Sequence, residues 1–303
     1  MKFKLLIIAL FMGQVVFAQT DKPVRVLGTK CSIVPPEGFI PATQFYGFMD
    51  TKTGSSIRIE EMPVPYQAYV DDFETIIASI RGLTLIDKDE IDFNHSKALL
   101  TKVRFDLFDT SIFSISLVFG NDDETVYVKG NYPESDKKIE ENIRKALLST
   151  QYDTLLNDNP TEAASFTVDL TGTEFKCVKF ESGSLYFLTD GRIGKEDPRI
   201  RIDQSFQKVN PENRKQFAKD RLNHLQESYQ LIVKDFKAIT IDHLEGYEIL
   251  AEGSISGTEI VSVYQLVLFT ESGGYYLFVG QCEKDVKQCT EEFRKIAMTF
   301  KRK

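Results

Sequence analysis

The sequence predicts an α+β protein made of two tandem α/β/α sandwich domains, each with a mainly antiparallel sheet between helices. Residues 130–147 align without a gap on residues 280–297 and keep the same apolar spacing. Both halves also show the order strand, helix, hairpin strands and final helix. The length of 303 residues suits two domains that each have a core. The identical pairs are Gly130 and Gly280, Lys137 and Lys287, Glu141 and Glu291, Arg144 and Arg294, and Lys145 and Lys295.

The chain begins with the features of a secretory signal peptide. Lys2 and Lys4 precede an apolar stretch, and Val16 and Ala18 stand at positions −3 and −1 of a cleavage site. A retained transmembrane anchor needs about 20 apolar residues, more than this stretch supplies. We therefore expect a mature protein that is exported to the periplasm or the extracellular space, soluble after cleavage and not membrane-spanning.

The first half should begin with a strand at residues 30–34, which ends at two consecutive prolines because proline cannot donate to a ladder. A strand at residues 56–60 alternates apolar and polar side chains. Residues 67–81 carry apolar side chains three and four positions apart, which predicts an amphipathic helix that ends at Gly82. Four strands and a helix complete this half, at residues 85–93, 98–108, 111–119, 125–129 and 136–148.

The second half repeats this order with local differences. A helix should start at Asn210 and Pro211, because asparagine is a favoured N-cap and proline a favoured first helical residue. This helix is expected to reach about residue 226 and to be more charged than its counterpart. Residues 190–198 form an insertion with two glycines. The opening strands are expected at residues 166–170, 175–180 and 199–203.

The hairpin strands of the two halves also align at an offset of 150 residues, which matches Leu117 with Val267. In the first half, this strand has Ser114 and Ser116 on the face opposite to Leu117. Its match, residues 264–269, is apolar on both faces. A strand of that kind lies between two layers, so we expect helices or a partner domain on both faces.

The segment between the halves is polar and lacks periodicity, which indicates a linker. The expected organisation is a signal peptide at residues 1–18, a first domain at 19–152, a linker at 153–163 and a second domain at 164–303.

The charge balance argues against nucleic acid as a partner. The formal net charge of −8 becomes −10 once Lys2 and Lys4 leave with the signal peptide. Binding to a phosphate backbone relies on clustered lysine and arginine. We therefore expect no nucleic-acid partner.

No motif in the chain predicts a reaction. The three histidines, His95, His224 and His243, do not form a metal-binding motif. The nearest approach to a nucleophile elbow, residues 253–257, has Ile255 where the serine would stand. The acidic clusters lack the spacing of a calcium loop, and no glycine-rich phosphate loop is present. We expect no catalytic residue, no metal and no cofactor, and therefore no enzyme.

One pair of positions that differs between the halves predicts a disulfide. In the first half, Tyr132 precedes the last helix and should fold over Ile139, as in a hydrophobic staple. The matching residues are Cys282 and Cys289, and a bond across so short a loop contributes about 2 to 3 kcal/mol. Free thiols, a redox dithiol and a metal pair are the alternatives.

The other two cysteines, Cys31 and Cys177, each lie in an opening strand of their own half. Four cysteines are few for a disulfide-built scaffold, so the core must supply most of the stability. We expect buried free thiols, with a bridge between the domains as the alternative.

The loop at residues 38–49 is unusually apolar for a connection, and an exposed apolar patch marks a binding face. The alternative is that its phenylalanines fold back onto the sheet, because this chain contains 23 Phe and no Trp to fill its cores. The candidate interaction surface consists of Phe39, Ile40, Phe45, Tyr46 and Phe48.

Three segments of the first half carry a resemblance to a known family. They are residues 31–39 with the motif Pro-Pro-Glu-Gly, residues 57–63, and Phe119 with Gly120 ahead of the last helix. In this order they resemble the PsbP/DcrB-like group of small α/β/α sandwich domains, and the second half fits with looser openings. The resemblance implies a non-catalytic module, since such domains are similar to partners of larger assemblies, including a photosystem subunit and a small-GTPase binder. It provides no catalytic residue.

Together these observations favour an exported interaction or assembly module of the bacterial cell envelope, whose partner is another envelope protein. The alternative is a carrier that holds a small hydrophobic or lipidic ligand between the domains or under the loop at residues 39–49.

Overall fold

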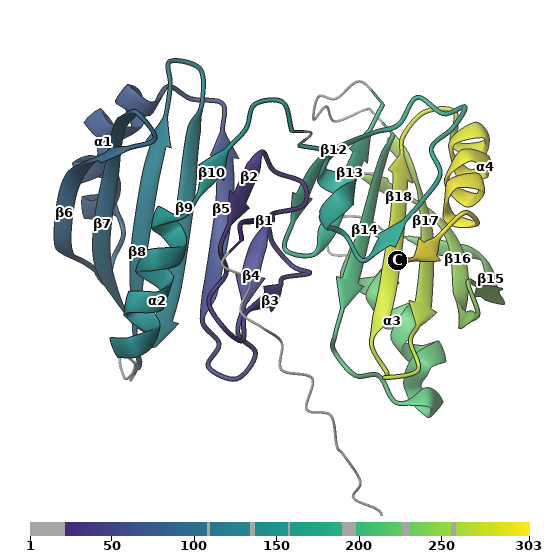
Figure 1. Ribbon diagram of the computed structural model, residues 1–303. Helices are drawn as coiled ribbons and strands as arrows, with labels where there is room; N and C mark the ends of the chain where they lie inside the picture. The colour runs from purple at the N-terminus through teal and green to yellow at the C-terminus, as the bar shows by residue number, and fades with distance from the viewer. Residues whose placement is uncertain are drawn as a thin grey trace, which may run out of the picture.

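The part of the chain that the structure describes forms two seven-stranded antiparallel sheets that stand side by side, each with two α-helices (Figure 1). This arrangement confirms the predicted fold class. The predicted signal peptide and residues 190–197 of the predicted insertion lie outside the described residues. The computed structural model describes residues 22–107, 110–133, 137–156, 158–189, 198–225, 231–255 and 259–303.

The first sheet has the strand order β3-β4-β5-β9-β8-β7-β6, and all its neighbours are antiparallel. Helix α1 follows β5, and α2 follows β9. The bounds are β3 Ile40–Pro41, β4 Gly47–Met49, β5 Ser56–Met62, α1 Tyr66–Ser79, β6 Leu83–Phe93, β7 Ser96–Leu107, β8 Thr110–Gly120, β9 Thr125–Pro133 and α2 Lys137–Leu148.

The second sheet repeats the topology with the order β12-β13-β14-β18-β17-β16-β15. Helix α3 follows β14 through a 3-10 turn, and α4 follows β18. The bounds are β12 Lys176–Glu181, β13 Ser184–Leu188, β14 Arg199–Ser205, η2 Pro211–Asn213, α3 Arg214–Leu225, β15 Ile232–Ile241, β16 Leu244–Ile255, β17 Glu259–Phe269, β18 Tyr275–Cys282 and α4 Val286–Ala297.

Short strands close the ends of both halves. In the first half, β1 and β10 pair with β2 on either side, and in the second, β11 pairs with β19. A 3-10 turn, η1, lies between the halves. The bounds are β1 Val24–Arg25, β2 Cys31–Ile33, β10 Gln151–Tyr152, η1 Pro160–Ala163, β11 Phe166–Thr167 and β19 Lys301–Arg302.

Each sheet lies between two helices, one on each face. In the first half, Ile143 of α2 is buried with Leu117 on one face, and Phe73 of α1 is buried with Val118 on the other. In the second half, α4 and α3 contribute to separate cores in the same way. The expectation that the strand near residue 266 is covered on both faces is therefore confirmed.

Gly130 and Gly280 allow the last helix of each half to approach the sheet closely. A Cβ added at Gly130 would lie 2.1 Å from Cγ2 of Ile143, and one at Gly280 would lie 2.5 Å from the ring of Phe293. Ile143 and Phe293 are themselves matched at the offset of 150 residues. The two identical glycines therefore have a packing reason.

The predicted offset of 150 residues is correct for the last strand and helix but wrong for the hairpin strands. Leu117 pairs with Val128 in the first sheet, and Leu266 pairs with Phe278 in the second, so Leu266 is the equivalent of Leu117. Val267, the predicted match, packs on the α3 face instead. The offset is 148 for β6 and β7 and 149 for β8, because each of the next two hairpin turns is one residue longer in the second half.

Candidate functional site between the two sheets

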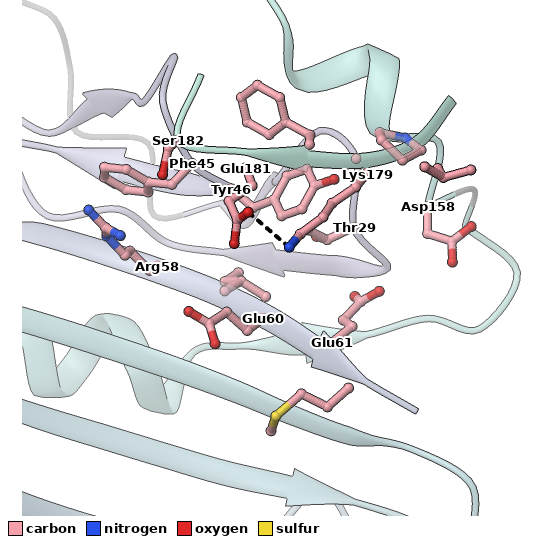
Figure 2. A pocket seen from close by; sticks show the side chains of 16 residues that line it. Thr29, Phe45, Tyr46, Arg58, Glu60, Glu61, Asp158, Lys179, Glu181 and Ser182 are labelled. Carbon is pink, nitrogen blue, oxygen red and sulfur yellow. Dashed lines mark ion pairs between the residues drawn. The ribbon is translucent and has the colours of Figure 1, made fainter. Parts of the chain in front are cut away.

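A cleft of about 550 Å³ lies where the two halves meet, and we call it the interdomain cleft (Figure 2). The first half contributes β5 and the loop between β3 and β4, and the second contributes β12. The connecting segment adds Asp158 and Pro160. Gly28 and Thr29 line it as well, so the cleft is assembled from five segments of the chain.

Tyr46 holds the two sides of the cleft together. Its ring packs against Phe180 with 5.3 Å between centroids, and it contacts the cores of both halves. Burial raises the pKa of the Tyr46 hydroxyl, which also interacts with the backbone of Phe180. Beside this contact, the Gly183 N–H donates to the Gln44 carbonyl at 2.9 Å. The seam thus combines apolar packing with backbone hydrogen bonding.

Charged side chains surround this aromatic contact. The Arg58 guanidinium lies 4.1 Å from the centre of the Phe45 ring, a cation–π arrangement. On the opposite side, Lys179 Nζ and Glu181 Oε2 are 2.9 Å apart, as the dashed line in Figure 2 marks. Glu60, Glu61 and Asp158 add three further carboxylates, so acidic groups outnumber basic ones in the lining.

Glu61 connects the cleft to the interior of the first half. Its Oε1 accepts hydrogen bonds from the Lys30 backbone N–H at 2.7 Å and from the Cys31 thiol at 3.7 Å. Burial raises the pKa of Glu61, and these hydrogen bonds oppose the shift. Burial also raises the pKa of the Cys31 thiol, so this thiol is not an activated nucleophile.

Lys30 also binds another carboxylate, that of Glu124, which does not line the cleft. It accepts hydrogen bonds from the Tyr152 hydroxyl and from Lys30 Nζ, the latter at 2.9 Å. Burial works against ionisation of Glu124, but the two hydrogen bonds outweigh it and lower its pKa. The group ties β10 to the turn before β9, which is a structural role.

The predicted interaction surface is divided by the fold. Phe39 and Phe48 are buried in the core of the first half, at 8% and 2% exposure. Ile40 is 52% exposed on β3. Phe45 and Tyr46 line the interdomain cleft. Only part of the predicted set is therefore accessible to a partner.

All four cysteines are free thiols in the structure. Cys282 and Cys289 are buried, and their thiols lie close enough to hydrogen-bond to each other. The disulfide between them stays a prediction. Cys31 is buried in β2, whereas Cys177 in β12 is only partly buried. The latter lies at the bulged edge of the second sheet.

The histidines lie in places that suit turns and surfaces. His95 and His243 occupy equivalent tight turns with φ of 65° and 61°. His224 is exposed near the end of α3. Within the described ranges, no hydrogen bond joins a Ser, Thr or Cys side chain to any of them. The same ranges contain no group of three or more His, Cys, Asp or Glu residues that could hold a metal ion.

The sequence did not identify Arg58, Lys179 or Glu181 as site residues. Arg58 was visible only as the polar member of an alternating strand, and the other two lie in an edge strand of the other half. Nothing in the sequence shows that these strands face each other. Among the described residues, no helix is long and apolar enough to cross a membrane.

Comparison with known proteins gives fold-level similarity only. No family model matches the chain, and no curated protein matches it. The chain is similar to a structure of the Tle4–Tli4 complex at 15% identity and a TM-score of 0.46, covering 92% of this chain and 97% of the other. It is similar to the T6SS immunity protein TplEi of Pseudomonas aeruginosa at 13% identity and a TM-score of 0.41, with the same coverage.

A third solved structure matches part of the chain. LpqN, described as involved in cell envelope biogenesis of Mycobacterium tuberculosis, is 18% identical with a TM-score of 0.34. The match covers 44% of this chain and 80% of LpqN. Identities and TM-scores at this level do not assign a function.

Proposed function

We propose that the protein is a non-catalytic interaction module of the bacterial cell envelope, and that another envelope protein binds in the interdomain cleft. The supporting observation is that both halves build one lined surface, with Phe45 and Arg58 from the first and Lys179 and Glu181 from the second. Aromatic residues and arginine are enriched in protein interfaces, with charged groups at the rim. The cleft has this composition.

The charges of the cleft suit a partner segment that carries lysine or arginine. Four carboxylates, those of Glu60, Glu61, Asp158 and Glu181, face two cationic side chains. Opposite charges across an interface orient the encounter and exclude like-charged partners. An extended basic segment would place its charged groups against the acidic rim and its apolar side chains against Phe45.

Affinity capture from an envelope extract tests this proposal with a matched pair of variants. Glu181→Lys reverses a cleft carboxylate that pairs with Lys179. Glu141→Lys reverses an exposed carboxylate on α2 that pairs with Lys145, outside the lining of the cleft. We expect a protein whose capture is the same with the wild type and with Glu141→Lys and is reduced at least fivefold with Glu181→Lys. Equal capture by both variants would place the interface elsewhere and contradict the proposal.

We also propose that the halves are domains at residues 19–152 and 164–303, joined by residues 153–163, and that the chain is exported after cleavage behind residue 18. Each seven-stranded sheet is made of strands from one half only, which supports the division. The intact mass of the protein purified from its source tests the cleavage. A first residue other than Gln19 would contradict the position of the cleavage site.

A further inference from the structure

A cavity of about 640 Å³ lies between α1 and the sheet of the first half, and it shares no lining residue with the interdomain cleft. Its roof is apolar and includes Ile76 and Ile77 of α1 and Ile80, the residue that follows this helix. Ile76 and Ile80 are 38% and 43% exposed, so α1 does not bury its apolar face fully against the sheet. The volume lies in the range of roughly 300–1,000 Å³ that ligand pockets occupy.

Part of the floor of this cavity is polar, although it belongs to the interior face of a sheet, and Val103, Phe105 and Ile112 form an apolar part. Thr101, Ser114 and Ser116 line it from β7 and β8, and each is less than 6% exposed. Lys129 of β9 lines it as well. The cavity is therefore amphipathic, with hydrocarbon from the roof and part of the floor, and with hydroxyl and ammonium groups from the rest of the floor.

In the second half, the equivalent face of the sheet is packed against α3 with apolar side chains. At the equivalent positions, Thr101 is replaced by Ile249, Ser114 by Val263 and Lys129 by Val279, given the offsets of 148, 149 and 150 residues. These three residues are buried in one core with side chains of α3. Polar groups and a cavity are thus not required by this fold.

The two halves also differ at Ser116 of β8. Ser116 has Gln265 as its equivalent, whose Nε2 donates to the Ala218 carbonyl of α3 at 2.8 Å. This hydrogen bond ties α3 to the sheet. In the first half, Ser116 instead lies 3.0 Å from the Tyr127 hydroxyl within the sheet, and α1 has no such tie through Ser116.

Lys129 is the charged group that this cavity leaves without a partner. It stands opposite Ser116 of β8 and Arg58 of β5. No hydrogen bond or ion pair joins its ammonium to another described residue. Burial lowers its pKa, and the attraction of Glu60 and the repulsion of Arg58 are smaller influences. A half-buried ammonium of this kind gains most from an anion placed beside it.

We propose that this cavity binds an anionic amphiphile with a single acyl chain, its head group at Lys129 and its chain beneath α1. The anionic head group would accept a charge-assisted hydrogen bond from the Lys129 ammonium, which has no such partner within the protein. The chain would cover the part of α1 that the sheet leaves exposed, which is favourable in proportion to the apolar area removed from water. This site differs from the two places that the sequence suggested for a ligand, between the domains and under the loop at residues 39–49.

Calorimetric titration of the full mature chain with four twelve-carbon amphiphiles tests the proposal. Dodecanoate and dodecyl phosphate carry anionic heads, dodecanol a neutral one and dodecyltrimethylammonium a cationic one. We expect the anions to bind at least tenfold more tightly than dodecanol, because a hydrogen bond to a charged group contributes about that factor. The cation should bind more weakly than dodecanol. A preference for one anion identifies the head group.

Two variants locate the binding. Lys129→Met should weaken dodecanoate binding at least tenfold and leave dodecanol within about twofold. Lys145→Met, on the opposite helix α2, serves as the matched control and should change neither. Ile80→Glu, at the mouth of the cavity, should weaken dodecanoate and dodecanol together. Circular dichroism of each variant checks that it folds.

Amide chemical shifts give a second measurement that does not depend on the variants. Addition of dodecanoate should shift amides of α1, β7, β8 and β9. Three results would overturn the proposal: no binding of either anion, equal binding of dodecanoate and dodecanol, or shifts centred on the interdomain cleft. Capture of a protein partner by the cleft is independent of all three.

Discussion

Removal of Arg294 should destabilise the second half more than removal of the carboxylate that Arg294 binds. This carboxylate, Glu248 of β16, is 2% exposed. Its Oε1 accepts hydrogen bonds from the Tyr264 hydroxyl and from Arg294 Nε, both at 2.7 Å. Its Oε2 accepts from Arg294 Nη2 at 3.1 Å and lies 2.7 Å from Lys237 Nζ. Every oxygen of the buried group is therefore paired.

The magnitudes follow from what each substitution leaves behind. Arg294→Met leaves Glu248 buried with half of its contacts and should cost about 2–3 kcal/mol, less than the 3–5 for a fully stranded ion. Glu248→Leu leaves Arg294 and Lys237 able to turn to water, because their side chains are 38% and 46% exposed. The buried Tyr264 hydroxyl loses the carboxylate to which it donates, at about 1–2 kcal/mol.

A double variant separates the carboxylate from the hydroxyl. The first half has Leu100 and Ile115 at the positions equivalent to Glu248 and Tyr264, so the fold accommodates apolar residues there. Glu248→Leu combined with Tyr264→Phe removes the stranded hydroxyl and keeps the aromatic ring. Its stability should return to within about 1 kcal/mol of the wild type, as with other buried ion pairs replaced by apolar side chains.

The effect of Glu248 should depend on pH in a defined direction. Burial works against its ionisation, but the hydrogen bonds from Arg294, Lys237 and Tyr264 outweigh burial and lower its pKa. A group whose folded pKa is lowered stabilises the protein above its unfolded pKa and loses this contribution as the pH falls through the folded pKa. The difference between the wild type and Glu248→Leu should therefore narrow below pH 4.5, the ordinary pKa of the group.

Urea unfolding of the full chain, followed by circular dichroism, measures these differences. Because two halves can unfold separately, hydrogen exchange at the amides of β16 and β17 assigns the transition to the second half. The reasoning would be refuted if Glu248→Leu cost as much as Arg294→Met, or if the double variant stayed as unstable as Glu248→Leu. Either result would mean that the desolvation of the stranded polar group does not determine which variant loses more stability.

Three further predictions concern other parts of the chain. Thiol labelling of the unfolded, non-reduced protein should find two free thiols, with Cys282 and Cys289 joined. Reduction of this disulfide should lower the stability by about 2 to 3 kcal/mol. Four free thiols would show that the bond does not form. Tyr152→Phe should lower the stability in urea unfolding by about 1 kcal/mol. It should also raise the pKa of Glu124 in an NMR titration, because the carboxylate loses a hydrogen bond. An unchanged pKa would contradict the hydrogen bond from Tyr152 to Glu124. Gly280→Ala should lower the stability by about 1–3 kcal/mol in the same assay, because the added Cβ would overlap the Phe293 ring of α4. A variant as stable as the wild type would show that α4 can move away from the sheet without loss of stability.

The sequence contained enough information for the architecture of the chain. Alternation in the strands and the three- and four-residue spacing in α2 and α4 report burial directly, so the faces of these elements were predictable. The register of the hairpins was not predictable in the same way. One extra residue in a turn shifts the next strand by one position, and a strand such as β17, which is apolar on both faces, shows no periodic signal of the shift.

The two candidate sites differ in how much the sequence could reveal. Ser114 and Ser116, opposite the apolar face of their strand, were a visible sign of a polar sheet face. Their meaning required the position of α1, which leaves the cavity above them. The interdomain cleft left no such sign, because Arg58 and Lys179 come together only through the packing of the halves. Long-range docking has no local pattern in the chain.

The comparison of the two halves gives the α1 face its significance. Both halves have the same strand order and bring a helix to this face, so the second half shows that a packed core is attainable there. Substitution of Lys129 by the valine found at position 279 would remove an unpaired ammonium from the interior. A protein that keeps an unpaired ammonium in this place is less stable than it could be. Positions that sacrifice stability in this way are concentrated at functional sites. In our proposals the amphiphile site belongs to the first half alone, whereas both halves line the interdomain cleft.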